Sequence, residues 1–282
     1  MALVGTPCLY GNAPETELRP ARWPGAPTKA HAGGEGEGMC YSAEASFGSG
    51  ALLLGAGAWC ARTAARKSPW FWPFAVVPVL FGVQQCTEGF VWLGIHGEKP
   101  LLVEVSSRIY LLFAIAFWPF WYSFAAWKME VDPRKKSFLG FWMGMSLIWV
   151  LAYLMAIRGD AGVPIACESG HSVRYNYSDS GGLWKTGVSK WISRIVYLVT
   201  AILPVLVMTH RKLLLAPAIG ASVTAFAAAL YYDHAFTSVW CLWSALVSAL
   251  IARSVWLAPA KAEDLFLKES KFRATGALCG SM

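Results

Sequence analysis

Four side chains that could do chemistry recur at intervals of four residues: Gln84, Glu88, Trp92 and His96. In an α-helix this spacing places them in one drifting stripe on a single face. An amide, a carboxylate and an imidazole on one face can hydrogen-bond a small ligand, bind a cation or exchange a proton. The residues around them are apolar, so Glu88 must be neutral, paired or bound to a cation. Glu88 is therefore the centre of a candidate site.

Polar groups elsewhere in the chain are predicted to converge on the same end of the molecule. The predicted ligand-binding residues are Glu44, Gln84, Gln85, Glu88, Trp92, Asp233, His234 and Cys241. Carboxylates and imidazoles can also be metal ligands, and a catalytic metal needs about three of them with one open position. A divalent metal would have Glu88, His96, Asp233 and His234 as its candidate ligands.

Each of these groups also has a purely structural interpretation. Glu44, His96 and Asp233 lie near the ends of apolar segments, where a charge can reach water. Glu88 could form a structural ion pair with Arg108 or Arg194. These alternatives stay open at the level of sequence.

The elements that would position these groups are seven apolar segments. The segments cover about residues 44–61, 69–95, 106–127, 138–157, 191–209, 213–231 and 235–257. A helix of roughly 20 apolar residues crosses the hydrocarbon core of a bilayer. The runs are continuous rather than alternating, which favours helices over strands. With a mean hydropathy of +0.45, the chain is predicted to be an all-α, polytopic membrane bundle of about seven transmembrane helices.

The distribution of Lys and Arg predicts the orientation of this bundle. Thirteen lie in loops and a tail on one side of the predicted membrane, and seven lie on the other, most of them in one long loop at 158–190. The positive-inside rule then puts the start of the first segment outside and the C-terminus in the cytoplasm. The net charge of +7 follows from this topology and from attraction to anionic lipid. The predicted partner is the lipid bilayer, and no nucleic acid is expected.

Tryptophans gather at or near the predicted segment ends. Trp92, Trp118 and Trp121 are among them, in a chain with 15 tryptophans. Indole side chains favour the membrane–water interface, so an interfacial belt is the main interpretation of this pattern.

The chain divides into three parts. Residues 1–38 are rich in Gly, Pro, Ala and Glu and are predicted to be a disordered extension, or a segment upstream of a natural start at Met39. Residues 39–258 form the predicted seven-helix domain. Residues 259–282 form a basic tail, expected in the cytoplasm.

The start of the predicted domain carries a resemblance to a known group of proteins. Residues 39–47 read MCYSAEASF, residues 80–85 read LFGVQQ, and shorter matches follow at 88–89, 91–93, 118–121 and 238–241. The chain thus resembles an uncharacterised family of bacterial multi-pass membrane proteins that begin Met-Cys-Phe/Tyr-Ser-Ala-x-Ala-Ser-Phe. The resemblance covers about residues 39–258. It implies a bacterial inner (plasma) membrane protein and carries no activity.

Three functions are compatible with these patterns. The leading one is an outer-leaflet polar pocket, formed by the first, second and seventh segments, that binds or conducts a small ligand, ion or proton. The first alternative is an intramembrane metal-dependent hydrolase, although a His-x-x-x-His pair in the last segment is missing because position 238 is Ser. The second is a non-catalytic accessory or scaffold subunit of a membrane complex. The long loop at 158–190 could fold over the pocket as a lid.

Overall fold

The computed structural model describes residues 42–156, 166–169, 172–175, 187–231, 236–262 and 264. These residues are mostly helical, which confirms the helical part of the predicted fold. Residues 1–38, Asp233, His234 and most of the tail lie outside the described residues.

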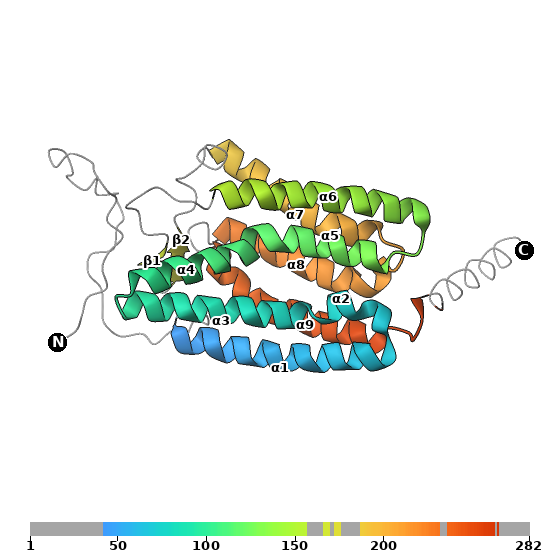
Figure 1. The fold of residues 1–282 in the computed structure, drawn as a ribbon, viewed down its shortest axis with the longest axis horizontal. Helices are drawn as coiled ribbons and strands as arrows, with labels where there is room; N and C mark the ends of the chain where they lie inside the picture. Colours follow the sequence, from blue (N-terminus) through green and yellow to red (C-terminus); the bar gives the residue numbers. More distant parts are fainter. Residues whose placement is uncertain are drawn as a thin grey trace, which may run out of the picture.

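The helices run along the long axis of the molecule (Figure 1). In chain order they are α1 (Ala43–Lys67), the 3₁₀ turn η1 (Pro69–Phe71), α2 (Trp72–Ala75), α3 (Val77–His96), α4 (Pro100–Leu111), the π-helix η2 (Leu112–Phe117), α5 (Trp118–Met129), α6 (Pro133–Ala156), α7 (Gly187–Val207), α8 (Arg211–Tyr231) and α9 (Phe236–Leu257). Each apolar segment of the sequence overlaps one of these helices or one run of consecutive helical pieces. Two stretches within the described ranges, Pro69–His96 and Pro100–Met129, are long and apolar enough to cross a membrane.

Helix α1 begins and ends at residues that suit a helix terminus. The side chain of Ser42 accepts a hydrogen bond of 3.2 Å from the backbone N–H of Ala45, which satisfies one of the free donors of the first turn. Glu44 lies in that first turn, and Arg66 and Lys67 lie in the last. Both placements complement the helix dipole.

Glycines allow α1 and α3 to pack closely. A Cβ added at Gly57 would lie 2.4 Å from the backbone nitrogen of Val79, and one added at Gly50 would lie 2.7 Å from Cys86 Sγ. On the other side of the contact, a Cβ at Gly89 would meet the ring of Phe47 at 2.9 Å. These contacts fix the register of α1 against α3, and therefore which residues of the two helices share a level in the bundle.

Three helix prolines leave carbonyl groups without an N–H donor in their own helix, and each of these carbonyls accepts a bond from a neighbouring helix. A proline has no N–H to donate to the carbonyl four residues earlier. The indole Nε1 of Trp149 donates to the carbonyl of Ile115, before Pro119, at 3.3 Å. Trp142 Nε1 donates to Thr200, before Pro204, at 3.3 Å. Ser254 Oγ donates to Leu213, before Pro217, at 2.5 Å.

The π-helix η2 explains a fourth bond of this kind. Pro119 lies where η2 passes into α5, so its missing N–H affects two carbonyls. By the four-residue spacing of an α-helix one of them is that of Ile115, and by the five-residue spacing of a π-helix the other is that of Ala114. The hydroxyl of Tyr197 on α7 donates to that carbonyl at 2.9 Å. Side chains of α6 and α7 therefore complete the backbone hydrogen bonds of η2.

A buried carboxylate fastens two turns together at the end opposite the start of α1. Glu130, in the α5–α6 turn, is 2% exposed. Its oxygens accept bonds from the backbone N–H groups of Val131 and Asp132, both at 2.8 Å. They also accept from the N–H of Thr209 at 2.7 Å and from its hydroxyl at 2.6 Å. The carboxylate thus joins the α5–α6 turn to the α7–α8 turn.

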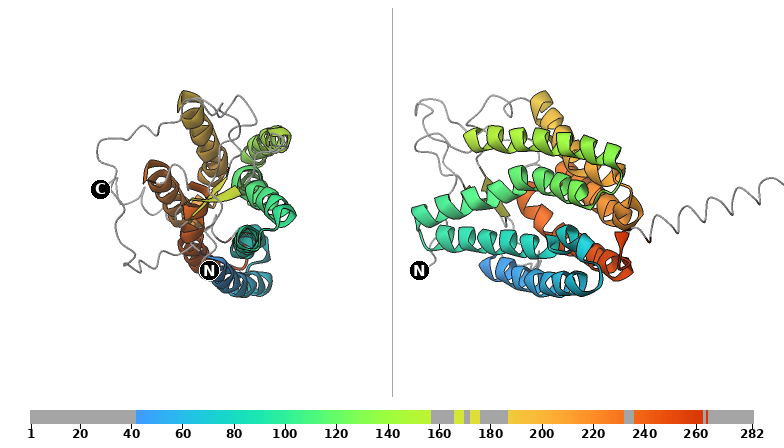
Figure 2. Two further views of the ribbon diagram at one scale, coloured as in Figure 1. Left: turned by 90° about the vertical axis from the view of Figure 1, so that its left-hand side faces the viewer. Right: turned by 45° about the vertical axis from the view of Figure 1, so that its right-hand side comes forward.

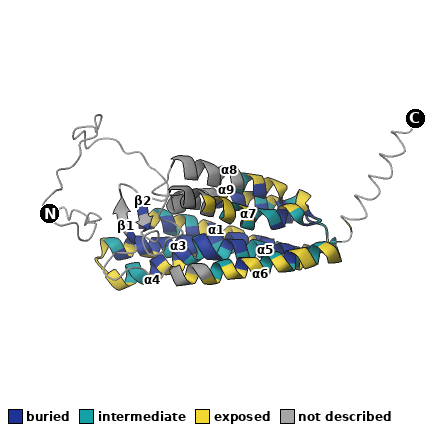
Figure 3. Ribbon diagram, turned by 90° about the horizontal axis from the view of Figure 1, so that it is seen from above, coloured by how far each residue is buried: buried dark blue, intermediate teal, exposed yellow. Residues whose placement is uncertain are grey.

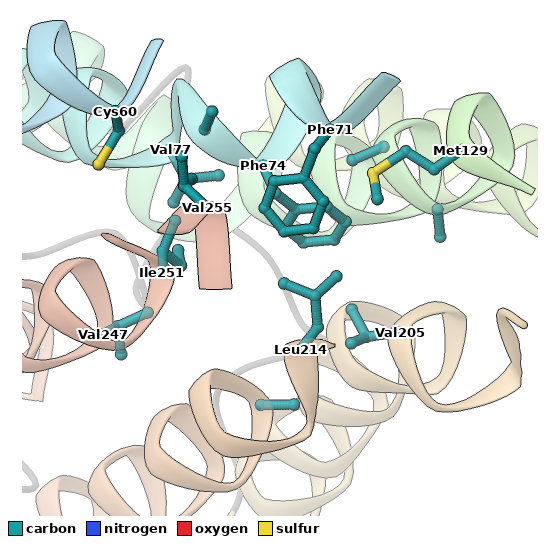
Figure 4. Close-up of a cluster of buried hydrophobic side chains, with 14 of the residues drawn as sticks. Cys60, Phe71, Phe74, Val77, Met129, Val205, Leu214, Val247, Ile251 and Val255 are labelled. Atoms are coloured by element: carbon teal, nitrogen blue, oxygen red, sulfur yellow. The ribbon is translucent and has the colours of Figure 1, made fainter. Parts of the chain in front are cut away.

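Buried apolar side chains form two clusters among the described residues. The inner cluster contains residues of η1, α1, α2, α3 and α5 through α9. Figure 4 shows Phe71 and Phe74 in this cluster facing Leu214 and Val205. The outer cluster lies around Trp92 and Tyr110 and includes Ala43 at the start of α1. Figure 3 shows that much of α3 is buried, whereas α6 carries many exposed residues.

A short hairpin belongs to the outer cluster. Strands β1 (Ala166–Ser169) and β2 (Ser172–Tyr175) pair antiparallel and lie at one end of the bundle, between its helices (Figure 2). The ring of Tyr175 stacks on that of Tyr110 at a centroid distance of 4.9 Å. The sequence predicted a loop here, at 158–190, and not the hairpin. Part of that loop does pack against the end of the bundle that holds the candidate residues.

Candidate ligand-binding site

Glu88 lies on α3 with no exposed surface. Gln85, one turn earlier on the same helix, donates from Nε2 to Glu88 Oε2 at 3.0 Å. A carboxyl group removed from water needs such donors, because burial without them is costly. The side chain of Gln85 is itself 1% exposed, so this bond belongs to the interior of the bundle.

Trp118 fixes the orientation of the neighbouring amide. Its indole nitrogen, which can only donate, lies 2.8 Å from Gln84 Oε1. The amide nitrogen of Gln84 must therefore point the other way, and it has no hydrogen-bond acceptor among the described residues. Trp118 directly follows the π-helix η2. A π-helical turn inside an α-helix often marks a functional site.

Two serines on helices that pack against α3 are also buried. Ser46 on α1 and Ser107 on α4 have no exposed surface, and neither hydroxyl has a hydrogen-bond partner among the residues described. Ser46 precedes Phe47, whose ring lies against Gly89, so Ser46 lies at about the level of Glu88. On α4, Val103 lies against Gly94 of α3. Ser107 comes one turn after Val103, so it lies about one turn closer to the level of Glu88. The indole N–H of Trp92, one turn farther out, also has no acceptor within the described ranges.

We call Ser46, Gln84, Gln85, Glu88, Trp92 and Ser107 the polar layer. It lies between the two apolar clusters. On one side, Trp92 itself packs in the outer cluster with Ala43 and Val173. On the other side, Phe81 of the inner cluster lies one turn before Gln85, and its ring packs on Trp118 at 4.2 Å. The polar layer is therefore enclosed by apolar side chains toward both ends of the bundle.

The structure brings together four of the residues predicted from sequence: Gln84, Gln85, Glu88 and Trp92. Glu44 and His96 are exposed, at the first turn of α1 and the last turn of α3, and lie outside the polar layer. Asp233 and His234 lie outside the described residues, as does the side chain of Cys241 on α9.

Of the proposed metal ligands, the structure describes Glu88 and His96, which it places apart, one buried and one exposed. No group of three or more His, Cys, Asp or Glu residues that could hold a metal occurs within the described ranges.

One structural alternative for Glu88 is wrong. Arg108 forms an ion pair of 2.7 Å with Glu104 on its own helix, and both side chains are nearly half exposed. It therefore does not serve as the buried partner of Glu88. The side chain of Arg194 is not described.

Sequence reasoning missed Ser46, Ser107 and Trp118. Trp92 and Trp118 were assigned to an interfacial belt, but each is only 1% exposed. Ser46 had a usable signal, because it continues the three- and four-residue spacing of small residues through Gly50 and Gly57 that forms the buried face of α1. Ser107 had no comparable signal.

These features define a class: a predominantly α-helical bundle with a buried carboxyl group in an enclosed polar layer. The chain belongs to the family described as "Family of unknown function (DUF6629)", whose model matches residues 39–264. The match agrees with the region over which the sequence resembles an uncharacterised family. No curated protein and no solved structure matches the chain.

Proposed function

We propose that this protein is a multi-pass membrane protein of about seven spans that binds a proton or a small cation at Glu88. The observation that carries the proposal is the complete burial of Glu88 beside the polar side chains of α1, α3 and α4. Ionisable groups inside a membrane bundle are rare and usually mark ion, proton or ligand sites.

The exterior of the bundle supports a membrane environment. Large apolar side chains on α6, α7 and α8 are exposed, among them Phe141, Ile148, Ile195, Ile219 and Val223. Exposed apolar surface on this scale is unusual for a soluble monomer. A lipid environment would solvate it.

The charges support the predicted orientation, with the start of α1 outside and the C-terminus in the cytoplasm. Glu130 joins the α5–α6 and α7–α8 turns. The helices that follow these turns carry Arg134 and Lys135 in the first turn of α6 and Arg211 and Lys212 in the first turn of α8. The α3–α4 turn at the other end carries one Lys and one Glu, at 99 and 98. This asymmetry is the one expected for a plasma-membrane protein of a bacterium.

The inner cluster favours binding over conduction. Between the polar layer and the cation-rich end, side chains such as Phe74, Leu214 and Ile251 pack against one another across the bundle. The outer cluster, which separates the polar layer from the end of the bundle that holds the hairpin, has fewer buried residues among those described. We therefore infer that the site exchanges its ligand through that end of the bundle.

The test compares Glu88→Gln with wild type in lipid nanodiscs. Glu104→Gln is the matched control, because it makes the same change in an exposed carboxylate. Infrared spectra would report a protonated carboxyl group, and melting temperatures would be measured in Na⁺, K⁺, Mg²⁺ and Zn²⁺ in turn.

The proposal expects one of two signals to disappear specifically in Glu88→Gln: the carboxyl band, or a rise in melting temperature caused by a cation. It also expects Glu88→Gln to be at least as stable as wild type, since a buried ionisable group has been removed. Absence of both signals in wild type, together with an unstable Glu88→Gln protein, would show that Glu88 is only structural.

A further inference from the structure

We infer that the polar layer binds water molecules, which hydrogen-bond to Ser46, Gln84, Trp92 and Ser107 and connect them to Glu88. This inference deepens the proposed function and rests on the same site. Water is then the ligand that completes the site. It also carries the proton between Glu88 and the end of the bundle where the hairpin lies.

The first step is the inventory of buried polar atoms. The amide nitrogen of Gln84 and the indole nitrogen of Trp92 can only donate hydrogen bonds, and neither has an acceptor among the described residues. The hydroxyls of Ser46 and Ser107 can donate and accept, and they also have no partner there. Each residue is at most 2% exposed. Leaving four such groups unpaired would remove a large part of the net stability of a typical domain.

Several other buried serines in the described part of the chain do have protein partners. Ser106 donates to the carbonyl of Leu102. The hydroxyls of Ser123 and Ser146 lie 2.9 Å apart, and each also lies within hydrogen-bond distance of a carbonyl of its own helix. One hydroxyl can therefore donate to the other, which in turn donates to its own carbonyl. A helix serine normally finds such a partner when it is buried. Unpaired hydroxyls are therefore not general among buried helix serines: besides the two in the polar layer, the described residues include one more, that of Ser248 on α9.

The chemistry of these groups selects water among small ligands. The two N–H groups need acceptors, whereas the hydroxyls of Ser46 and Ser107 can use a donor or an acceptor, and water supplies both. A cation at Glu88 would by itself leave the N–H groups of Gln84 and Trp92 unpaired, so water would be needed beside it. An anion would be repelled by Glu88 whenever that group is ionised. A larger organic ligand would have to displace one of the two apolar clusters that enclose the layer.

The sign of a stability change tests the inference. Ser46→Ala and Ser107→Ala would be measured against Ser123→Ala, whose hydroxyl has protein partners. If water satisfies the two hydroxyls, each variant loses a hydrogen bond, and its folding equilibrium constant should fall about threefold to tenfold, as for Ser123→Ala. If the hydroxyls are truly unpaired, removing them relieves a penalty. A higher melting temperature in both Ser46→Ala and Ser107→Ala, with a lower one in Ser123→Ala, would overturn the inference.

A second measurement detects the water directly. Infrared spectra of the full chain in D₂O and in H₂¹⁸O should show sharp water bands that shift with the isotope. Trp92→Phe removes an indole N–H while keeping an aromatic ring, and it should change those bands. Glu88→Gln should keep water bands while losing any carboxyl band, so failure here is distinguishable from failure of the proposed function. Identical spectra for wild type and Trp92→Phe would count against water at this site.

Discussion

The indole N–H of Trp142 on α6 donates to the carbonyl of Thr200 on α7, the carbonyl that Pro204 leaves without a donor in its own helix. An unpaired carbonyl inside a bundle is costly. The proline is therefore tolerated because a side chain of another helix replaces the missing N–H. The same relationship recurs between Trp149 and Ile115 and between Ser254 and Leu213.

We expect Trp142→Phe to lower the free energy of unfolding by about 0.5–1.5 kcal/mol. In a Pro204→Ala background the loss should be smaller, because an alanine at that position would supply the N–H that Thr200 needs. Unfolding of the two single variants and the double variant, measured in the same detergent, gives the coupling between them. Strictly additive effects would mean that the two residues act independently.

We expect Gly57→Ala to destabilise the protein by at least about 1–3 kcal/mol. Its Cβ would lie within 3 Å of three atoms of Val79, two of them backbone atoms, so α1 would have to move away from α3. Gly48→Ala is the control, since a Cβ there meets nothing within 4 Å. It should be neutral or stabilise the helix by about 0.5–1 kcal/mol. Equal melting temperatures for the two variants would contradict the close contact.

We expect Glu130→Gln to cost at least about 1–3 kcal/mol. The carboxylate accepts four hydrogen bonds from the two turns. An amide keeps one acceptor oxygen, and its NH₂ group would face a donor. Glu104→Gln, on an exposed pair, should change stability by less than about 1 kcal/mol. Chemical denaturation measures the stability of both variants. A Glu130→Gln protein as stable as Glu104→Gln would show that the four hydrogen bonds of Glu130 contribute little.

We expect Lys99→Cys to react with a membrane-impermeant maleimide from outside intact cells, and Arg134→Cys only after the membrane is opened. Lys99 lies in the α3–α4 turn and Arg134 in the first turn of α6, at the opposite end of the bundle (Figure 1). Background labelling of the native cysteines would be subtracted with the unsubstituted protein. The reverse pattern would move the polar layer to the cytoplasmic side.

The helices and part of the site could be predicted from the sequence. Continuous apolar runs located α1, α3 and α6 through α9, because a helix satisfies the backbone hydrogen bonds of a long apolar run within the run itself. The four-residue spacing from Gln84 to Trp92 correctly indicated one buried face of α3. Both inferences depend only on residues that are close in the chain.

The rest depends on contacts between distant segments. The apolar run around Leu112 gives no sign of a π-helix, because the bonds that complete it come from Trp149 and Tyr197 on later helices. From the sequence, Trp118 looks like an interfacial residue. In the structure its indole N–H donates a hydrogen bond to Gln84 Oε1 inside the bundle. A hydropathy pattern cannot distinguish an indole at the interface from one that serves a buried acceptor.

The side chains that replace the missing proline N–H groups also bear on how the chain is made. Synthesis proceeds from the N-terminus, so Trp142 on α6 exists before Pro204 is added. The carbonyl of Thr200 on α7 can therefore accept its hydrogen bond from Trp142 as soon as α7 forms. Ile115 and Leu213 are synthesised before Trp149 and Ser254, the residues that donate to their carbonyls. Each of these carbonyls therefore lacks its donor until the following helix has been made. For a bundle assembled in lipid, α5 with α6, and α8 with α9, would then enter the bilayer as paired units during biogenesis, whereas α7 could enter alone.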